Sequence, residues 1–114
     1  MPARVTAKSR KAASPRLDPR AMAKHAGKAA DFLKALANDQ RLAILCSLLD
    51  GPQSVSQINE RVRLSQSALS QHLAVLRERE LVETERQAQA VYYSVPEGKT
   101  RRLLEVLHDC FCNS

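Results

Sequence analysis

The sequence predicts a mainly α-helical domain with one small β-hairpin, in the order α-α-α-α-β-β-α. Apolar residues recur at helical spacing in four segments before residue 80 and in one segment after residue 98. Between them, residues 81–86 and 91–95 are rich in Val, Thr and Tyr, which favour strands. The length of 114 residues fits one domain. A chain of this size buries only about two-thirds of its unfolded surface, so we expect self-association to add stability.

The first two helices are expected over residues 21–37 and 41–50. The first carries an Ala-rich sequence, which favours helix, with apolar residues at helical spacing: Ala26, Ala29, Phe32, Leu33 and Leu36. Asn38 or Asp39 is a suitable N-cap for the second helix. Gly51-Pro52 ends it, since Gly accepts a left-handed conformation and Pro cannot continue a helix.

The third and fourth helices are joined by a tight turn at Arg63-Leu64. Ser54 and Gln57 have the spacing of a capping box, which predicts a helix to about Val62. Ser65 is expected to cap the fourth helix, residues 66–79. Two helices with so short a connection are typical of a helix-turn-helix.

The hairpin and the last helix complete the predicted domain. A polar link at residues 87–89 separates the two strands, without the Asn-Gly or Asp-Gly pair of the strongest hairpin turns. Pro96 ends the second strand. Apolar residues then predict an amphipathic helix from about Gly98 to Cys112: Leu103, Leu104, Val106, Leu107 and Phe111.

The positive charge is concentrated at the N-terminus. Lys and Arg total 18 against 12 Asp and Glu, a net charge of +6. Residues 1–20 hold six basic residues against Asp18 alone, with three prolines and few large apolar groups. We interpret this segment as a disordered basic arm, with a mitochondrial transit peptide as the alternative. Residues 21–114, the predicted DNA-binding and dimerisation domain, are nearly neutral.

Composition excludes several other classes of protein. No apolar run is long enough to span a membrane, and three cysteines without a signal-peptide pattern favour a cytoplasmic protein with reduced thiols. The chain has only three Gly and shows none of the phosphate-binding or catalytic motifs that we sought, so we expect no enzyme and no cofactor. A small thiol enzyme that uses Cys112 and His108 is the alternative.

The fourth predicted helix has the face of a major-groove reader. On a helical wheel, Leu69, Leu73 and Leu76 form one stripe, while a second face gathers small and polar residues: Ser67, Ser70, Gln71 and Ala74. Such side chains can hydrogen-bond to base edges. A solvated face would look similar, but the hairpin that follows, with Arg86 near its tip, favours a winged helix-turn-helix on double-stranded DNA. We expect His72, between the two faces, to pack or to contact phosphate.

Three stretches resemble the ArsR/SmtB family of bacterial repressors: residues 36–45, residues 64–76 with the run Ser-Gln-Ser-Ala-Leu-Ser-Gln-His-Leu, and residues 90–95. The resemblance covers about residues 25–112. It implies a dimeric winged helix-turn-helix whose first and last helices form the interface. It also implies that these residues contact operator DNA: Gln66, Ser67, Ser70, Gln71 and His72.

The two common metal sites of this family are absent. The start of the third helix has no thiol or imidazole, and the last helix has Glu105, His108 and Asp109 without the second ligand pair. Taken alone, Cys46 could be a small buried apolar residue and Cys112 an incidental terminal cysteine. His108, one turn before Cys112, could favour its thiolate.

Cys46 and Cys112 resemble, in their contexts, the two sensing cysteines of the BigR/SqrR-like branch of the family. That resemblance implies release of DNA when persulfides, other reactive sulfur or oxidants link the two thiols. Cys110 has no counterpart. The alternatives are a repressor that binds arsenite or a soft metal through its cysteines, and a constitutive architectural DNA-binding protein.

Overall fold

The computed structural model describes residues 17–113, which divide into two units between residues 33 and 34. Most of the predicted arm, residues 1–16, lies outside the described residues. Helix α1 (Pro19–Leu36) begins two residues before the predicted start, because the Asp18 carboxylate accepts a hydrogen bond from the Arg20 N–H at 3.0 Å. Met22 and Leu33 of α1 are exposed, whereas its last turn belongs to the second unit and buries Ala35 and Leu36.

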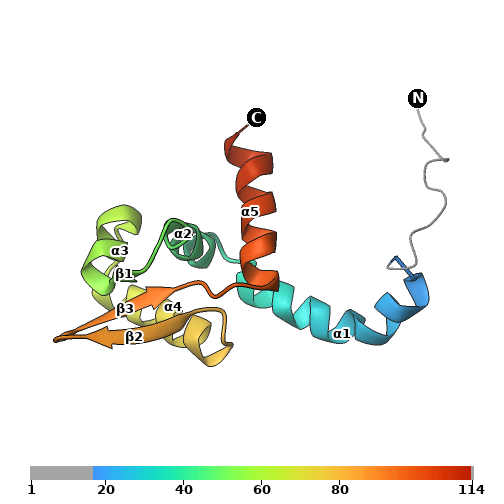
Figure 1. Ribbon diagram of the computed structural model, residues 1–114, viewed down its shortest axis with the longest axis horizontal. Helices are drawn as coiled ribbons and strands as arrows, with labels where there is room; N and C mark the ends of the chain where they lie inside the picture. Colours follow the sequence, from blue (N-terminus) through green and yellow to red (C-terminus); the bar gives the residue numbers. More distant parts are fainter. Residues whose placement is uncertain (1–16, 114) are drawn as a thin grey trace. The chain divides into compact units, whose positions relative to one another are not determined.

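The second unit is built around α2 (Asp39–Ser47), which packs against α3 (Val55–Val62), α4 (Gln66–Glu78) and α5 (Lys99–Cys112) (Figure 1). Its largest fully buried side chains are all aliphatic: Ile44, Leu45, Leu48, Ile58, Leu69, Leu76 and Leu104. Helix α2 therefore contacts every other helix that belongs wholly to this unit.

The predicted caps of α2, α3 and α4 are confirmed. Asn38 Oδ1 accepts hydrogen bonds from the backbone N–H groups of Gln40 and Arg41, both at 3.0 Å. Ser54 and Gln57 form the capping box in both directions. Ser65 Oγ accepts from Ala68 N at 3.2 Å. These bonds satisfy N–H groups that a helix start leaves without a partner.

Helix α2 ends at Ser47, three residues before its predicted end at Asp50. The Ser47 carbonyl accepts hydrogen bonds from Gln53 Nε2 at 2.7 Å and from Arg61 Nη1 at 3.0 Å. Leu48 then closes a tighter turn, donating its N–H to Leu45 O at 3.0 Å. Side chains from later in the chain therefore terminate this helix, and the Gly51-Pro52 signal marks only the end of the turn that follows.

The strands form one antiparallel sheet in the order β1-β3-β2. Strands β2 (Glu83–Gln87) and β3 (Ala90–Ser94) make the predicted hairpin, and β1 (Gln53–Ser54) pairs with the other edge of β3. The two-residue β1 is too short to have been predicted. The fold class is otherwise as predicted, a mainly α domain with one hairpin. Within residues 17–113, no helix is long and apolar enough to cross a membrane.

Candidate DNA-reading face and thiol pair

Helix α4 carries a buried stripe and an exposed polar face. The stripe is the one that the helical wheel predicts: Leu69, Leu73 and Leu76. The exposed residues include four of the predicted DNA contacts: Gln66, Ser67, Ser70 and Gln71. Their amides and hydroxyls are donors and acceptors that can pair with base edges in the major groove.

His72 differs from these four residues because it already has a protein partner. It is half-buried, and its Nε2 lies 2.8 Å from Gln40 Oε1 in the first turn of α2. The Gln40 amide oxygen is an acceptor, so the His72 ring nitrogen donates. The structure therefore gives His72 a part in holding α4 against α2, and the sequence offered no sign of Gln40 as its partner.

The turn between α3 and α4 depends on Asn59, which sequence reasoning missed. Asn59 Oδ1 accepts from Leu64 N at 2.7 Å, and Asn59 Nδ2 donates to Leu64 O at 3.0 Å. Between them, Arg63 adopts a left-handed conformation with φ of 57°. The paired bonds hold the chain reversal that sets α4 against α3. An Asn four residues before a non-Gly turn residue is the signal that could have indicated this.

The hairpin presents Arg86 close to its tip. The tip is a two-residue turn at Ala88-Gln89, and Arg86 pairs with Val91 in the register of β2 and β3. Arg86 is exposed. Its position fits a contact with phosphate or the minor groove beside the helix-turn-helix.

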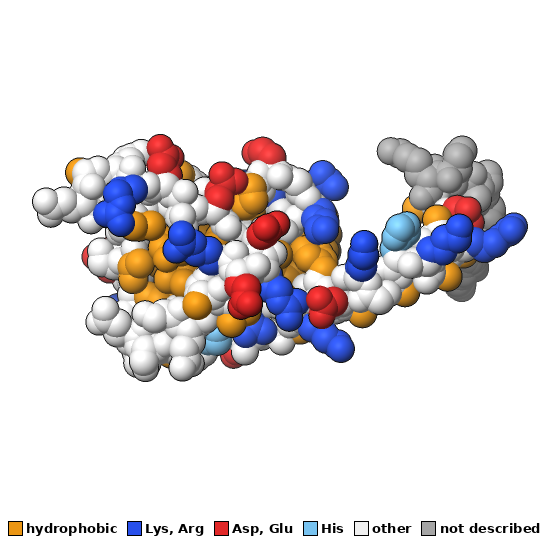
Figure 2. Space-filling model, turned by 90° about the horizontal axis from the view of Figure 1, so that it is seen from below, with side chains coloured by type: hydrophobic (Ala, Val, Ile, Leu, Met, Phe, Trp, Pro, Cys, Tyr) orange, Lys and Arg blue, Asp and Glu red, His pale blue; other side chains and the backbone are white. Residues whose placement is uncertain are grey.

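Basic side chains are not gathered into one patch on the face shown in Figure 2. Blue and red side chains are interspersed over the second unit in that view. This distribution matches the nearly neutral composition of residues 21–114. A contact between this unit and DNA would therefore depend on shape and hydrogen bonding more than on net charge.

Cys46 and Cys112 lie close enough for their charges to interact, although one lies on α2 and the other is the last residue of α5. Cys46 is half-buried, while Cys110 and Cys112 are exposed. Burial raises the pKa of the Cys46 thiol, and a negative charge on the nearby Cys112 raises it further. Cys46 is therefore mostly protonated near neutral pH, and Cys112 is the more accessible thiol.

An open groove of about 550 Å³ lies beside Cys46. Cys46 forms part of its wall together with residues of α3, α5 and the turn after α2: Leu49, Asp50, Arg61, Glu105, His108, Asp109 and Asn113. His108 thus lies at the groove, one helical turn before Cys112. The groove admits a small reactant to the partly buried sulfur of Cys46.

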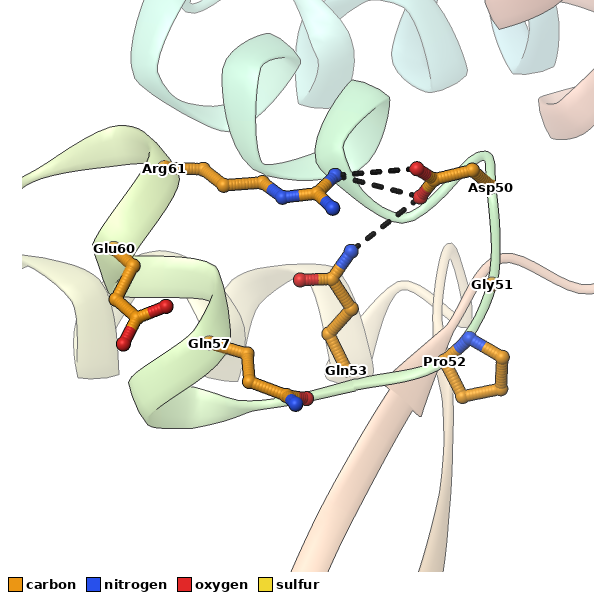
Figure 3. A pocket seen from close by; sticks show the side chains of 7 residues that line it. All are labelled: Asp50, Gly51, Pro52, Gln53, Gln57, Glu60 and Arg61. Carbon is orange, nitrogen blue, oxygen red and sulfur yellow. Dashed lines mark hydrogen bonds and ion pairs between the residues drawn. The ribbon is translucent and has the colours of Figure 1, made fainter.

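A second, polar pocket of about 340 Å³ adjoins the end of α2 (Figure 3). In it, Arg61 reaches from α3 to the Asp50 carboxylate at 3.4 Å, and Gln53 Nε2 lies 3.4 Å from the same carboxylate. Exposed ion pairs contribute little stability by themselves. Here the two contacts with Asp50 hold the Arg61 and Gln53 side chains in place to bond the Ser47 carbonyl. These bonds fix the end of α2 directly after Cys46.

Among residues 17–113, no three His, Cys, Asp or Glu side chains are grouped as they would be to hold a metal ion. Cys110 is exposed on α5, and nothing in the described part of the chain assigns it a role. The site is therefore described by its two neighbouring thiols and the adjoining groove.

Comparison with known proteins places the chain in a family. Residues 38–84 match the bacterial regulatory proteins of the arsR family. The transcriptional activator HlyU of Vibrio cholerae is 47% identical over 93 residues, which cover 82% of this chain and 86% of the relative. The chain belongs to the ArsR family. Members of this family are transcriptional regulators that bind DNA, and the predicted resemblance is confirmed.

Solved structures agree with this assignment. The transcriptional repressor BigR from Xylella fastidiosa superimposes with a TM-score of 0.76 at 35% identity, covering 84% of this chain and 95% of that one. A homodimeric winged helix-turn-helix DNA-binding domain from Mycobacterium bovis gives a TM-score of 0.67 at 28% identity, covering 85% and 89%. The fold of this ArsR-family chain is therefore a winged helix-turn-helix, with β2 and β3 as its wing.

Proposed function

We propose that this chain is a homodimeric repressor that binds operator DNA when reduced and releases it when Cys46 and Cys112 are linked. One observation carries the proposal: the partly buried Cys46 on α2 lines the same open groove as His108 and Asn113 at the end of α5 that carries the exposed Cys112. A small reactant can enter this groove. A link between Cys46 and Cys112 would join α2, which contacts α4, to the far end of α5.

DNA binding would use two elements of each protomer. The exposed residues of α4 would read base edges in the major groove: Gln66, Ser67, Ser70 and Gln71. His72, bonded to Gln40, would orient α4 and contact DNA from its edge. Arg86 of the wing would contact phosphate or the minor groove. The basic segment 1–20 would add affinity that does not depend on DNA sequence.

The dimer would form through α1 and α5. Helix α5 leaves Val106 and Phe111 largely exposed, and α1 leaves Met22 and Leu33 exposed. Exposed apolar side chains of this size favour burial against a second copy. The M. bovis relative is described as homodimeric. Two copies would present their α4 helices to successive major grooves, about 34 Å apart.

The chemistry would start at the exposed Cys112. Its thiolate attacks the outer sulfur of an organic persulfide, R–S–SH, to give Cys112–S–SH and the thiolate R–S⁻. The Cys46 thiolate then attacks the sulfur bonded to the Cys112 side chain and displaces HS⁻, which leaves a disulfide.

Two other reactions would also link the sulfur atoms of Cys46 and Cys112. A peroxide would convert Cys112 to a sulfenic acid, and attack by the Cys46 thiolate would then release hydroxide. If both cysteines carry a persulfide, one can displace H₂S from the other and leave a trisulfide. A direct disulfide requires Cα atoms within about 7 Å, and inserted sulfur relaxes that limit.

A structure of the V. cholerae relative is described as reduced HlyU. The oxidation state of the thiols is therefore the first condition to control when DNA binding by this chain is measured.

Intact-protein mass and a gel shift test this proposal together. DNA that the reduced protein selects from a random duplex pool serves as the operator. After treatment with an organic persulfide, we expect loss of two hydrogens or gain of sulfur, a Cys46–Cys112 peptide, and loss of the shifted band. Cys110→Ser should behave like the natural chain, and Cys46→Ser should bind DNA without responding. An unchanged shift by fully bridged protein would refute the proposal.

A further inference from the structure

Arg101 of α5 is a nearly buried cation that joins three segments of the second unit. Its side chain is 17% exposed. Nη1 donates to the carbonyl of Leu49, in the turn after α2, at 3.1 Å, and Nη2 donates to the carbonyl of Val95, directly after β3, at 2.8 Å. One guanidinium thus connects the start of α5 to the end of α2 and to the base of the wing.

The chemistry of this contact is specific to arginine. A guanidinium is a rigid planar fork whose donors point in fixed directions, so it can bond two carbonyls on separate segments at once. Lysine has one flexible ammonium and cannot reproduce that geometry. Because the donor is charged, both bonds are stronger than those between neutral groups.

The third donor of Arg101 has no hydrogen bond. Nε is buried and lacks a partner at hydrogen-bond distance among the described residues. The Glu97 carboxylate lies 3.8 Å from it, and the Glu105 carboxylate lies 3.9 Å from Nη1. Glu97 is 94% exposed and is free to approach. Within residues 17–113, Nε thus has no acceptor of its own, and the Glu97 carboxylate is the acidic group that could supply one.

We propose that Arg101 is the positioning residue that transmits the state of the thiol pair to the wing; this inference rests on the proposed function. Leu49 lies three residues after Cys46, and Cys112 lies at the opposite end of α5 from Arg101. Cys112 lies eleven residues after Arg101, a rise of about 16 Å along the helix. A bridge at Cys112 shifts the far end of α5, so α5 pivots at Arg101. The Arg101 guanidinium then exchanges its bond to the Val95 carbonyl for a bond to the Glu97 carboxylate.

As a consequence, the thiol pair changes how firmly the wing is held, although neither thiol contacts the DNA. Val95 directly follows the strand that pairs with β2, which carries Arg86. Loss of the bond from Arg101 to Val95 frees the base of the hairpin. The reduced thiol pair thereby favours the bond from Arg101 to Val95, and the bridged pair favours the bond to Glu97. Coupling between distant sites requires such an element, whose two arrangements the first site can favour in turn.

Arg101→Lys in the full chain tests this inference, with Arg102→Lys as the matched control because Arg102 is an exposed neighbour on the same helix. The measurement is the ratio of operator Kd between bridged and reduced protein, by fluorescence anisotropy. For the natural chain and Arg102→Lys we expect a ratio above about 100. For Arg101→Lys, which lacks the bond to Val95 in both thiol states, we expect the reduced protein to bind operator already about as weakly as the bridged natural chain, and a ratio below about five. Hydrogen exchange in residues 83–94 should respond to bridging only in the first two proteins.

The outcomes separate the inference from the proposed function. If the natural chain keeps its affinity when bridged, both are overturned. If it loses affinity and Arg101→Lys loses as much, only the inference is overturned. Should Arg101→Lys fail to fold, Glu97→Ala replaces it, because Glu97 is exposed and the substitution removes the acceptor that Nε would take. We expect Glu97→Ala to lower the ratio about tenfold, and an unchanged ratio would contradict the inference.

Discussion

Replacement of Asn59 by Ala should loosen the turn that sets α4 against α3. The substitution removes two hydrogen bonds, at 2.7 and 3.0 Å, to the backbone of the half-buried Leu64. Each such bond contributes about 0.5–1.5 kcal/mol, so the free energy of unfolding should fall by about 2 kcal/mol. At about 4–8 °C per kcal/mol for a domain of this size, Tm should fall by about 8–16 °C.

The assay is thermal unfolding followed by circular dichroism, at one protein concentration because the Tm of a dimer depends on it. Asn113→Ala is the matched control: the same side chain is removed, but its bond to Asp109 is exposed and 3.3 Å long. We expect the control to change the unfolding free energy by less than about 0.5 kcal/mol. Operator affinity of Asn59→Ala, measured well below its Tm, should fall about tenfold because α4 is no longer held at one angle.

The reasoning fails if Asn59→Ala melts within about 2 °C of the natural chain and binds operator equally well. That result would mean that the left-handed Arg63 and the Ser65 cap hold the turn without Asn59. Loss of stability with unchanged operator affinity would show instead that the turn stabilises the fold but does not orient α4.

Three further outcomes follow from the same structure. Gln71→Ala removes an exposed side chain, so Tm should stay constant while discrimination between operator and a mismatched duplex falls by about 1–3 kcal/mol in competition gel shifts; equal discrimination would exclude Gln71 from base reading. Deletion of residues 1–16 removes five basic residues and no acidic one, so the slope of log K against log salt should become shallower by about 0.9 for each phosphate that the arm no longer neutralises, and an altered sequence preference would contradict this. Bridge closure should accelerate about tenfold per pH unit between pH 6 and 8, because the raised pKa of Cys46 keeps its thiol protonated there; a rate that levels off below pH 8 would show a lowered pKa.

Local signals predicted most of the second unit, and long-range contacts account for what they missed. The caps at Asn38, Ser54 and Ser65 depend on residues within three positions, and each is confirmed. The end of α2 was misplaced because Gln53 and Arg61 reach back to the Ser47 carbonyl from later segments. The position of the hairpin turn was predicted only approximately, because Ala88 takes φ of 56° at a place where glycine or asparagine is usual.

The candidate site shows the same division. The helical period of α4 separated Leu69, Leu73 and Leu76 from the polar face without any structural knowledge. No spacing rule could place Cys46 beside Cys112, since only packing of α5 against α2 brings their segments together. The partners of His72 and Arg101 were equally hidden, because both side chains bond residues on separate elements.

The most direct test of the account is the operator Kd of homogeneous Cys46–Cys112-bridged dimer against that of the same dimer after reduction. Fluorescence anisotropy at fixed salt gives both values from one preparation. The account predicts that bridging raises Kd at least about 100-fold, equivalent to about 3 kcal/mol, and that reduction restores it. Equal Kd values for bridged and reduced dimer would contradict the central claim that the thiol pair controls DNA binding.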